Sequence, residues 1–302
     1  MIVQPWDLKD AVDELYRLGL PPGFSTGWKT VDPHYTIQPG QFTVITGIPG
    51  HGKSEWLDAL CIHLAKTGKW HFFVFSPENL PVELHIAKLV QKWEGKMFGA
   101  HPFRRMSADE MHLALSLVNR HFGFIRPLEG REQVQSLDWV VDQAVAEIAI
   151  HRRIGENYNY GIVLDPWNEV EHQRGIQFSE TEYISHALSY LRRAAREVPF
   201  HAWIVAHPRI LQKDKSGVRP VPTLYDISGS AHWYNKCDAG ITVWRDTAVS
   251  PEIVQIHVQK VRFRHLGVPG MVELKWDPLT GRYYDLSKAE SENGTGHPDN
   301  SF

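Results

Sequence analysis

The stretch FTVITGIPGHGKSEW, residues 42–56, decides the fold of this chain. It begins with an apolar, β-branched run, which predicts a buried strand over 42–47. It then turns through three glycines, reaches Gly-Lys-Ser, and continues into a helical pattern over 54–68 that closes at a glycine. A strand, a loop of the form G-x-x-x-x-G-K-[ST] and a helix, in that order, predict a phosphate-binding loop.

The physical chemistry of this loop explains why these residue types are needed. Glycines allow backbone N–H groups to turn inward around an anion, and the helix N-terminus adds partial positive charge. We expect the Lys53 ammonium to reach the β- and γ-phosphates of a nucleoside triphosphate and the Ser54 hydroxyl to bind Mg²⁺. The loop residues expected to bind nucleotide are Gly47, Gly50, Gly52, Lys53 and Ser54.

The rest of the chain alternates apolar runs with helical patterns, which predicts an α/β fold with a mostly parallel sheet flanked by helices. The predicted strands of this part are 71–78, 122–128, 160–167 and 201–208, and the helices are 81–96, 107–120, 132–151 and 180–198. Three later strands with little helix between them predict an antiparallel extension near the C-terminus. Those strands are 239–246, 254–263 and 271–277.

Three segments organise the chain. Residues 1–22 predict an amphipathic helix, because Leu8, Val12, Leu15 and Leu18 recur at helical spacing before two prolines. This helix packs either on its own domain or on a neighbouring subunit. Residues 23–287 form the main domain, and the polar, aperiodic residues 288–302 predict a disordered tail.

Composition restricts the function classes only weakly. The formal net charge of −3 neither requires nor excludes a nucleic-acid partner, because a local basic strip is enough to bind one. Cys61 and Cys237 belong to no zinc-ligand spacing and are expected to be reduced thiols. The scattered histidines do not indicate a metal cluster. No run of about 20 apolar residues indicates a membrane span.

Three polar residues follow predicted strands, where ligands gather in a parallel sheet. Asp165 ends the strand at 160–167 and is expected to complete the Mg²⁺ site, with a turn-capping aspartate as the alternative. Glu78 is a candidate to polarise the attacking water, or else a solvated loop glutamate. His207 is a candidate to hydrogen-bond the γ-phosphate, or else a core histidine.

These motifs in this order resemble the RecA-like, P-loop NTPase motor of DnaB-type (superfamily 4) replicative helicases, in the Twinkle and phage primase–helicase branch. The resemblance covers residues 20–285 or so. The stretches that carry it are STGWKTVD, FSPEN, VLDPW, VAHPR, YDISGS and QKVRF, in addition to the phosphate-binding loop. It implies that Lys53, Ser54 and Asp165 bind nucleotide and Mg²⁺, Glu78 is catalytic and His207 senses the γ-phosphate. It also implies that the helix in 1–22 docks on an adjacent subunit.

The resemblance gives four further residues a role. Lys260 and Arg262 match a K-x-R whose arginine acts on the ATP of the neighbouring subunit, although Arg262 is also readable as a surface charge of a strand. A guanidinium is suited to neutralise charge on phosphate oxygens in the transition state. Arg245 and Trp276 stand where the phage branch holds the nucleotide base, with a core role for Trp276 as the alternative.

A basic, glycine- and serine-containing segment between His207 and Trp244 is expected to face single-stranded DNA in a central channel. Lysine and arginine attract phosphates, and small residues permit close backbone approach. The residues concerned are Arg209, Lys213, Lys215, Arg219, Ser228, Gly229, Ser230 and Lys236.

The sequence therefore predicts an ATP-dependent DNA helicase motor that moves along single-stranded DNA as a hexameric ring, with ATP or another NTP or dNTP and Mg²⁺ as cofactors. The alternatives are a RecA- or RadA-like recombination ATPase that forms filaments on DNA and a non-motor ATP switch or loader. A primase or another replisome protein is a candidate partner, and no membrane partner is expected. The expected location is the cytoplasm of a bacterial or phage-infected cell, ahead of an organellar matrix.

Overall fold

A computed structural model describes residues 2–127, 134–171, 179–212, 219–229 and 231–286. Nine strands form one sheet in the order β3-β2-β4-β5-β1-β6-β7-β8-β9. The parallel part consists of β1 (Phe42–Thr46), β2 (Trp70–Phe75), β3 (Phe122–Phe124), β4 (Asn159–Leu164), β5 (Phe200–Val205) and β6 (Ala239–Trp244). The antiparallel part consists of β7 (Ile253–Val261), β8 (Gly270–Trp276) and β9 (Tyr283–Asp285). The predicted fold class is confirmed.

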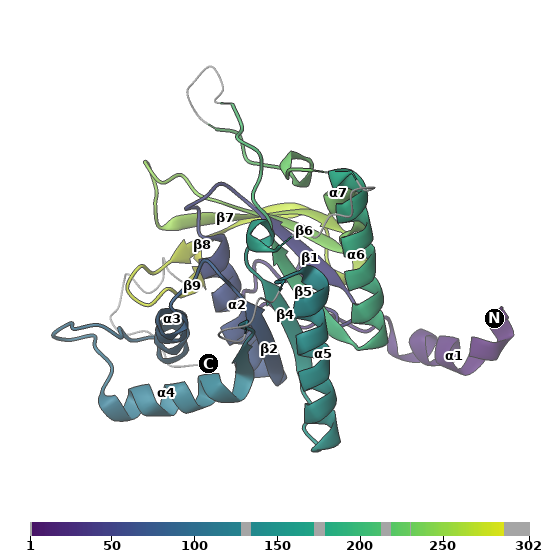
Figure 1. Ribbon diagram of the computed structural model, residues 1–302, viewed down its shortest axis with the longest axis horizontal. Coiled ribbons are helices and arrows are strands. Elements are labelled where there is room, and N and C mark those ends of the chain that lie inside the picture. Colours follow the sequence, from purple (N-terminus) through teal and green to yellow (C-terminus); the bar gives the residue numbers. More distant parts are fainter. Residues whose placement is uncertain (1, 128–133, 172–178, 213–218, 230, 287–302) are drawn as a thin grey trace.

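Helices cover both faces of the parallel part (Figure 1). One face carries α2 (Lys53–Gly68), α3 (Val82–Glu94) and α4 (Ala108–His121). The other carries α5 (Leu137–Arg153), α6 (Glu180–Glu197) and the short α7 (His232–Lys236). Side chains alternate between the two faces along each strand. In β1, Ile45 packs on the face that carries α2, α3 and α4, and Val44 packs on the face that carries α5, α6 and α7. Both side chains are fully buried, which stabilises the fold by about 1.5–3 kcal/mol for each such residue.

Three predicted strands are shorter than the sequence indicated, and the same cause applies to each. β2, β4 and β5 end before Pro77, Pro166 and Pro208. Proline has no N–H to donate to the sheet, so the chain leaves the ladder at these positions. The residues beyond each strand form short loops at one edge of the sheet, and these loops carry Glu78, Asp165 and His207.

Other differences concern elements that lack a periodic signal. The strand predicted at 122–128 is only three residues long as β3. The helix predicted from 132 begins at Leu137. Ser136 caps this helix, because its hydroxyl accepts from the Trp139 N–H. The sequence indicated neither α7 nor β9, each too short to show a period. Four 3₁₀ turns were not predicted either: η1 (Pro5–Leu8), η2 (Trp167–Glu169), η3 (Leu224–Asp226) and η4 (Arg264–Leu266).

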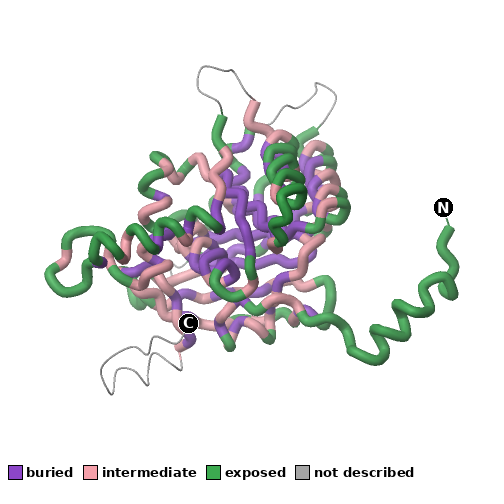
Figure 2. Tube along the Cα trace, turned by 90° about the horizontal axis from the view of Figure 1, so that it is seen from below, coloured by how far each residue is buried: buried purple, intermediate pink, exposed green. Residues whose placement is uncertain are grey.

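Helix α1 (Lys9–Leu18) projects away from the domain, and Figure 2 shows it exposed along its length. None of its residues is buried, and its apolar positions Val12 and Leu15 are 56% and 43% exposed. It ends at Gly19, whose φ of 82° favours glycine. An isolated helix of this length is marginal in water unless its apolar stripe is covered. The structure therefore does not support packing of α1 on its own domain.

The segment STGWKTVD, near the start of the main domain, is a turn closed by one carboxylate. The side chain of Asp32 accepts from the Ser25 hydroxyl at 2.6 Å and from the Thr26 N–H at 2.7 Å. The predicted tail 288–302 lies outside the described residues, and the predicted domain limits stay predictions. Within the part of the chain that the structure describes, no helix combines the length and apolar character that crossing a bilayer requires.

Candidate nucleotide site

The loop between β1 and α2 has the backbone of an anion cradle. Gly47, Gly50 and Gly52 have φ values of 149°, 81° and 94°, a region that side chains rarely adopt. A Cβ at Gly47 would lie 2.2 Å from the carbonyl oxygen of Val243, so this position also excludes any larger residue. The N-terminus of α2 opens directly from the loop. Its free N–H groups and its dipole therefore favour a phosphate at this point.

Lys53 is held over the loop by the loop's own carbonyl groups. Its Nζ donates to the Gly47 oxygen at 2.8 Å and to the Ile48 oxygen at 3.3 Å. The residue is only 5% exposed. Burial lowers the pKa of Lys53 to about 8, and the charges of Asp165 and Glu78 oppose that shift. The ammonium is thus poorly solvated and positioned to exchange carbonyl partners for phosphate oxygens.

Asp165 lies directly after β4, and the Ser54 hydroxyl donates a hydrogen bond to it. The residue is 5% exposed, and burial raises the pKa of its carboxyl to about 6. A buried carboxylate and a neighbouring hydroxyl are the oxygen ligands that a hard divalent cation prefers. Ser54 and Asp165 therefore fit the Mg²⁺ site that the sequence indicated.

Replacing Asp165 by Asn is expected to stabilise the metal-free protein above pH 6. The folded-state pKa is raised from 3.8 to about 6, so stability is lost as pH rises through this window. Removing the charge should recover about 2–3 kcal/mol at pH 8, at 1.36 kcal/mol for each pKa unit. Urea unfolding without Mg²⁺ at pH 8 and pH 4 measures this gain, which should vanish at pH 4. An equal effect at both pH values would contradict the assignment.

Glu78 and His207 meet across the mouth of the same cleft. The His207 Nε2 lies 3.7 Å from the Glu78 Oε1, and the Glu78 side chain is half exposed. Burial, followed by the charge of Lys53, lowers the pKa of His207, so the imidazole is neutral near pH 7. Its Nδ1 is buried and has no hydrogen-bond partner among the described residues. The cleft is lined by loop residues together with side chains from three strand ends: Gly50, Gly52, Lys53, Ser54, Glu78, Asp165 and His207.

Several residues that support this cleft were not predicted. Asn168 accepts from the His207 N–H at 3.0 Å and thereby fixes that loop. Asn79 donates to the Ser76 hydroxyl at 2.8 Å, and Lys88 of α3 donates to Asn79 at 3.3 Å. Lys88 also lines the cleft and adds a second cation to it. Asn79 directly follows Glu78 in FSPEN, whereas no local pattern marks Lys88 or Asn168.

The predicted base-binding residues lie beside the loop and against each other. The Arg245 guanidinium is 5.0 Å from the centroid of the Trp276 ring and donates to the Gly50 oxygen at 2.8 Å. His51 accepts from the Arg245 N–H at 3.1 Å, and burial lowers the pKa of His51 to about 4, so it acts as a neutral acceptor. A guanidinium plane and an indole face are suited to stack on a base. That they hold the base stays a prediction.

Lys260 and Arg262 lie at the opposite end of the sheet from the loop. Lys260 pairs with Gly240 at the start of β6. Arg262 Nε is 2.8 Å from Asp238 Oδ1, and the other oxygen of Asp238 accepts from the N–H of Phe42, the first residue of β1. β1 has five residues and is therefore about 17 Å long, at a rise of about 3.3 Å per residue. This strand separates Arg262 from the phosphate-binding loop of the same chain.

The described members of the predicted DNA-binding set have different surroundings. Arg209 donates to the Tyr225 oxygen at 3.4 Å, and Arg219 is exposed beside the segment 213–218, which the structure does not describe. Gly229 has a φ of 91°. The Lys236 ammonium donates to the backbone and hydroxyl oxygens of Ser185 and to the hydroxyl of Ser189, so it is engaged inside the subunit. Ser228 lies beside α7 and accepts from Trp233. Lys213, Lys215 and Ser230 lie outside the described residues.

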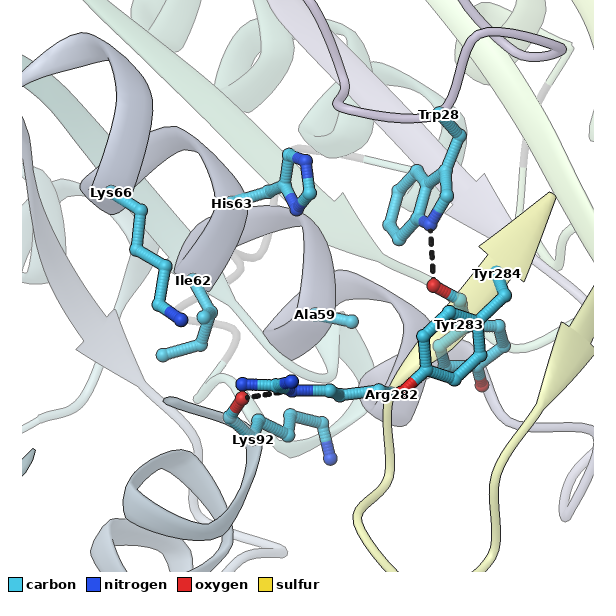
Figure 3. Close-up of a pocket in the computed structure, with 9 residues that line it drawn as sticks. All are labelled: Trp28, Ala59, Ile62, His63, Lys66, Lys92, Arg282, Tyr283 and Tyr284. Atoms are coloured by element: carbon cyan, nitrogen blue, oxygen red, sulfur yellow. Dashed lines mark hydrogen bonds between the residues drawn. The ribbon is translucent and has the colours of Figure 1, made fainter. Parts of the chain in front are cut away.

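A second pocket lies behind α2 and is built from cations and aromatic rings (Figure 3). Two of its cations already donate hydrogen bonds to backbone oxygens. Arg282 Nε donates to the Lys92 oxygen at 2.8 Å, and Lys66 Nζ donates to the Trp93 oxygen at 2.7 Å. Trp28 donates to the Tyr283 oxygen at 2.9 Å. The Arg282 bond ties the β8–β9 hairpin to the C-terminal end of α3, the Lys66 bond ties α2 to α3, and the Trp28 bond adds β9, so the pocket is a structural junction beside α2.

Together, the fold and the cleft define a RecA-like P-loop nucleotide-binding domain: β5 lies between the strand of the phosphate loop and the strand of Asp165. No protein-family model matches the chain. The Twinkle homolog protein, chloroplastic/mitochondrial, of Arabidopsis thaliana is 41% identical over 288 residues, covering 92% of this chain and 39% of the relative. The chain thus spans about two-fifths of the length of that curated relative. The resemblance to Twinkle-like, DnaB-type helicase motor domains that the motifs indicated is thus confirmed over most of this chain.

Solved structures show the same fold. The ATPase domain of G40P matches with a TM-score of 0.75 and 16% identity, over 92% of this chain and 98% of that one. A DnaB-like replicative helicase, described with its interactions with primase, matches with a TM-score of 0.74 and 18% identity, over 94% and 69%. The RadB recombinase matches with a TM-score of 0.53 and 17% identity, over 87% and 99%. At these identities the likeness concerns the fold.

Proposed function

We propose that the chain is the ATP-driven motor of a DNA helicase, which moves along single-stranded DNA as a hexameric ring and hydrolyses nucleotide at its subunit interfaces. The observation that carries the proposal is a division of the catalytic groups. Lys53, Asp165 and Glu78 converge on one cleft, whereas Arg262 lies at the far end of β1. Arg262 therefore does not serve the cleft of its own chain. In a closed ring, Arg262 of the next subunit supplies the guanidinium that completes the cleft.

Within one cleft, the chain's own groups divide the work of hydrolysis. Loop N–H groups and Lys53 hold the phosphates in line, and the Glu78 carboxylate orients the attacking water and accepts its proton. His207 donates to a γ-phosphate oxygen from a neutral imidazole. Mg²⁺ held by Ser54 and Asp165 would neutralise charge on the β- and γ-phosphate oxygens. Arg262 of the adjacent subunit stabilises the charge that spreads over the γ-phosphate in the transition state.

DNA contact is proposed for the segment after β5. Arg209 and Arg219 are exposed, and Lys213, Lys215 and Ser230 belong to the same segment although the structure does not describe them. A ring concentrates such loops around one channel, which compensates for the formal net charge of −3 on each chain. Single-stranded DNA binding should therefore weaken steeply as salt is raised.

Helix α1 supplies a second feature that suits a ring, because its apolar stripe is uncovered within the chain. We expect Leu15→Asp to abolish hexamers at concentrations where the wild-type protein assembles, since a charge would enter the docked stripe. The expected change in monomer stability is near zero because Leu15 is exposed. Sedimentation measures assembly, and the matched control is Glu14→Gln on the same turn. Unchanged assembly of the Leu15 variant would contradict docking of α1 on a neighbour.

The experiment that tests the function measures ATP hydrolysis and separation of a forked DNA duplex, with electron micrographs of the same samples. The wild-type chain should hydrolyse ATP faster with single-stranded DNA, separate the fork and form closed rings, and Lys53→Ala should do neither reaction. Open filaments on DNA without rings would favour the recombinase alternative, for which the RadB match supplies a related fold. ATP binding without appreciable turnover would favour the switch or loader.

A primase is a proposed partner of this chain. One DnaB-like helicase with the same fold was solved in a study of its interactions with primase. Co-sedimentation with a primase encoded by the same genome tests this partnership.

The proposed location is the cytoplasm of a bacterial or phage-infected cell, while the name of the Arabidopsis relative indicates organelles.

A further inference from the structure

One buried carboxylate, Asp238, lies directly before β6 and pairs with Arg262. Asp238 has a side chain only 1% exposed, and its Oδ2 accepts from the Phe42 N–H at 3.1 Å. Its Oδ1 is 2.8 Å from the Arg262 Nε but receives no aligned hydrogen bond from any residue that the structure describes. The contact with Arg262 is therefore an ion pair that lacks the directed bond a guanidinium makes in its tightest pairs. Oδ1 keeps the capacity to accept from another donor.

A second arginine, Arg192 of α6, lies over the ring of Phe42. Its Nε and Nη2 are buried and make no hydrogen bond among the described residues, and its guanidinium lies 5.7 Å from the centroid of the Phe42 ring. Burial lowers the pKa of Arg192, the charge of Asp238 opposes this shift, and Arg262 adds to it. Arg192 and Asp238 also share a neighbour, because Arg192 lies over the Phe42 ring and the Phe42 N–H donates to Asp238. A buried donor without an acceptor is costly and is rarely left so in a single stable state.

Lys260 and Arg262 both donate hydrogen bonds to backbone oxygens near α7. Lys260 donates to the Tyr234 and Asn235 oxygens. The Arg262 Nη2 donates to the oxygens of residues 235–237, at 3.1 to 3.4 Å. Of the two arginines, Arg262 therefore pairs with Asp238, whereas Arg192 has donors that make no hydrogen bond among the described residues.

We propose that Asp238 changes partner during the catalytic cycle: it holds Arg262 while the neighbouring nucleotide site is empty and pairs with Arg192 when Arg262 extends to the neighbour's γ-phosphate. This inference rests on the proposed action of Arg262 on the next subunit. If Arg262 left without a replacement, a buried carboxylate would lose its counter-charge, which opposes extension strongly. Arg192 removes that obstacle because its Nε and Nη2 make no hydrogen bond among the described residues and it packs on Phe42, whose N–H donates to Asp238. Arg192 is then a positioning residue that never touches the nucleotide.

The test is a double-mutant cycle on DNA-stimulated ATP hydrolysis. Arg192→Met keeps the apolar stem but removes the charge, and we expect kcat to fall about 10-fold, the scale of coupling between neighbouring charged groups. KM for ATP should change less than about 2-fold, because the nucleotide site of the same chain lies beyond β1. In the Asp238→Asn background the same substitution should change kcat by less than about 2-fold, since no buried charge needs a new partner. Arg193→Ala, an exposed arginine of α6, is the matched control and should behave as wild type.

Each outcome decides the matter. An equal loss of kcat from Arg192→Met with and without Asp238→Asn would overturn the partner change, because a purely structural role gives additive losses. If Asp238→Asn fails to fold, Arg192→Lys decides instead: it keeps a charge and should recover most of the kcat that Arg192→Met loses, whereas equal losses overturn the inference. Wild-type turnover of Arg262→Ala in the same assay would show that the proposed function itself fails. Impaired Arg262→Ala with unimpaired Arg192→Met would refute the partner change alone.

Discussion

Arg262→Ala is expected to lower ATP turnover by about 10³–10⁵-fold, the range over which an arginine that stabilises a phosphoryl-transfer transition state acts. Nucleotide binding should be unchanged, because about 17 Å of β1 lies between Arg262 and the loop of its own chain. Removing Arg262 also leaves Asp238 without its ion-pair partner, so some loss of stability should accompany the change. Steady-state hydrolysis gives the turnover, and fluorescent-nucleotide titration gives the affinity.

Mixing this variant with Lys53→Ala separates action on a neighbour from a structural effect. An Arg262→Ala subunit has an intact cleft but no arginine, and a Lys53→Ala subunit has the arginine but no working cleft. In rings formed at equal amounts, about one quarter of the sites combine an intact cleft with an intact arginine, since each interface of a ring is heterologous. Two inactive proteins should therefore regain turnover on mixing. Absence of recovery at every ratio would contradict action between subunits.

The sequence predicted the cleft because its groups obey local rules. The phosphate loop is contiguous, and its glycines and Lys53-Ser54 stand between a strand and a helix. Glu78, Asp165 and His207 each follow a strand of one parallel sheet, and parallel strands end at the same edge. Nothing more than strand identity was needed to expect these three side chains together.

The remainder depends on contacts between distant parts of the chain. Strand β9 is held by pairing with β8 and by Asp285, which accepts from the N–H groups of Lys29 and Thr30 at 3.0 and 3.1 Å. Lys236 looked like an exposed cation in a basic segment, yet its partners Ser185 and Ser189 belong to α6. A three-residue strand and a half-buried, hydrogen-bonded lysine have no periodic signature, so only the assembled fold identifies them.

The association of Arg192, Asp238 and Phe42 illustrates the same limit. These residues come from α6, the start of β6 and the start of β1, and no spacing in the sequence relates them. The K-x-R pattern marked Arg262 but gave no indication of the carboxylate that holds it. Local patterns therefore indicated the groups that we propose to bind the nucleotide, whereas the groups that we propose to control Arg262 became evident only from packing.

Glu78→Gln is expected to lower turnover by about 10²–10⁴-fold, the contribution typical of a positioned general base. Glutamine keeps the shape of the side chain and its contact with His207, 3.7 Å away, but it cannot accept the proton of the attacking water. Affinity for ATP should be equal or higher, because one negative charge near the γ-phosphate is removed. Single-turnover hydrolysis measures the chemical step, and nucleotide titration measures the affinity.

The matched control is Glu83→Gln, an exposed carboxylate in the first turn of α3 that does not line the cleft. It removes the same charge from the same region and should change turnover by less than about 2-fold, as surface substitutions away from a site do. If both substitutions lower turnover equally, the effect is long-range charge and not proton acceptance. If Glu78→Gln has wild-type turnover, Glu78 is not the base, and slow hydrolysis in both proteins would then indicate that the chain uses ATP as a switch.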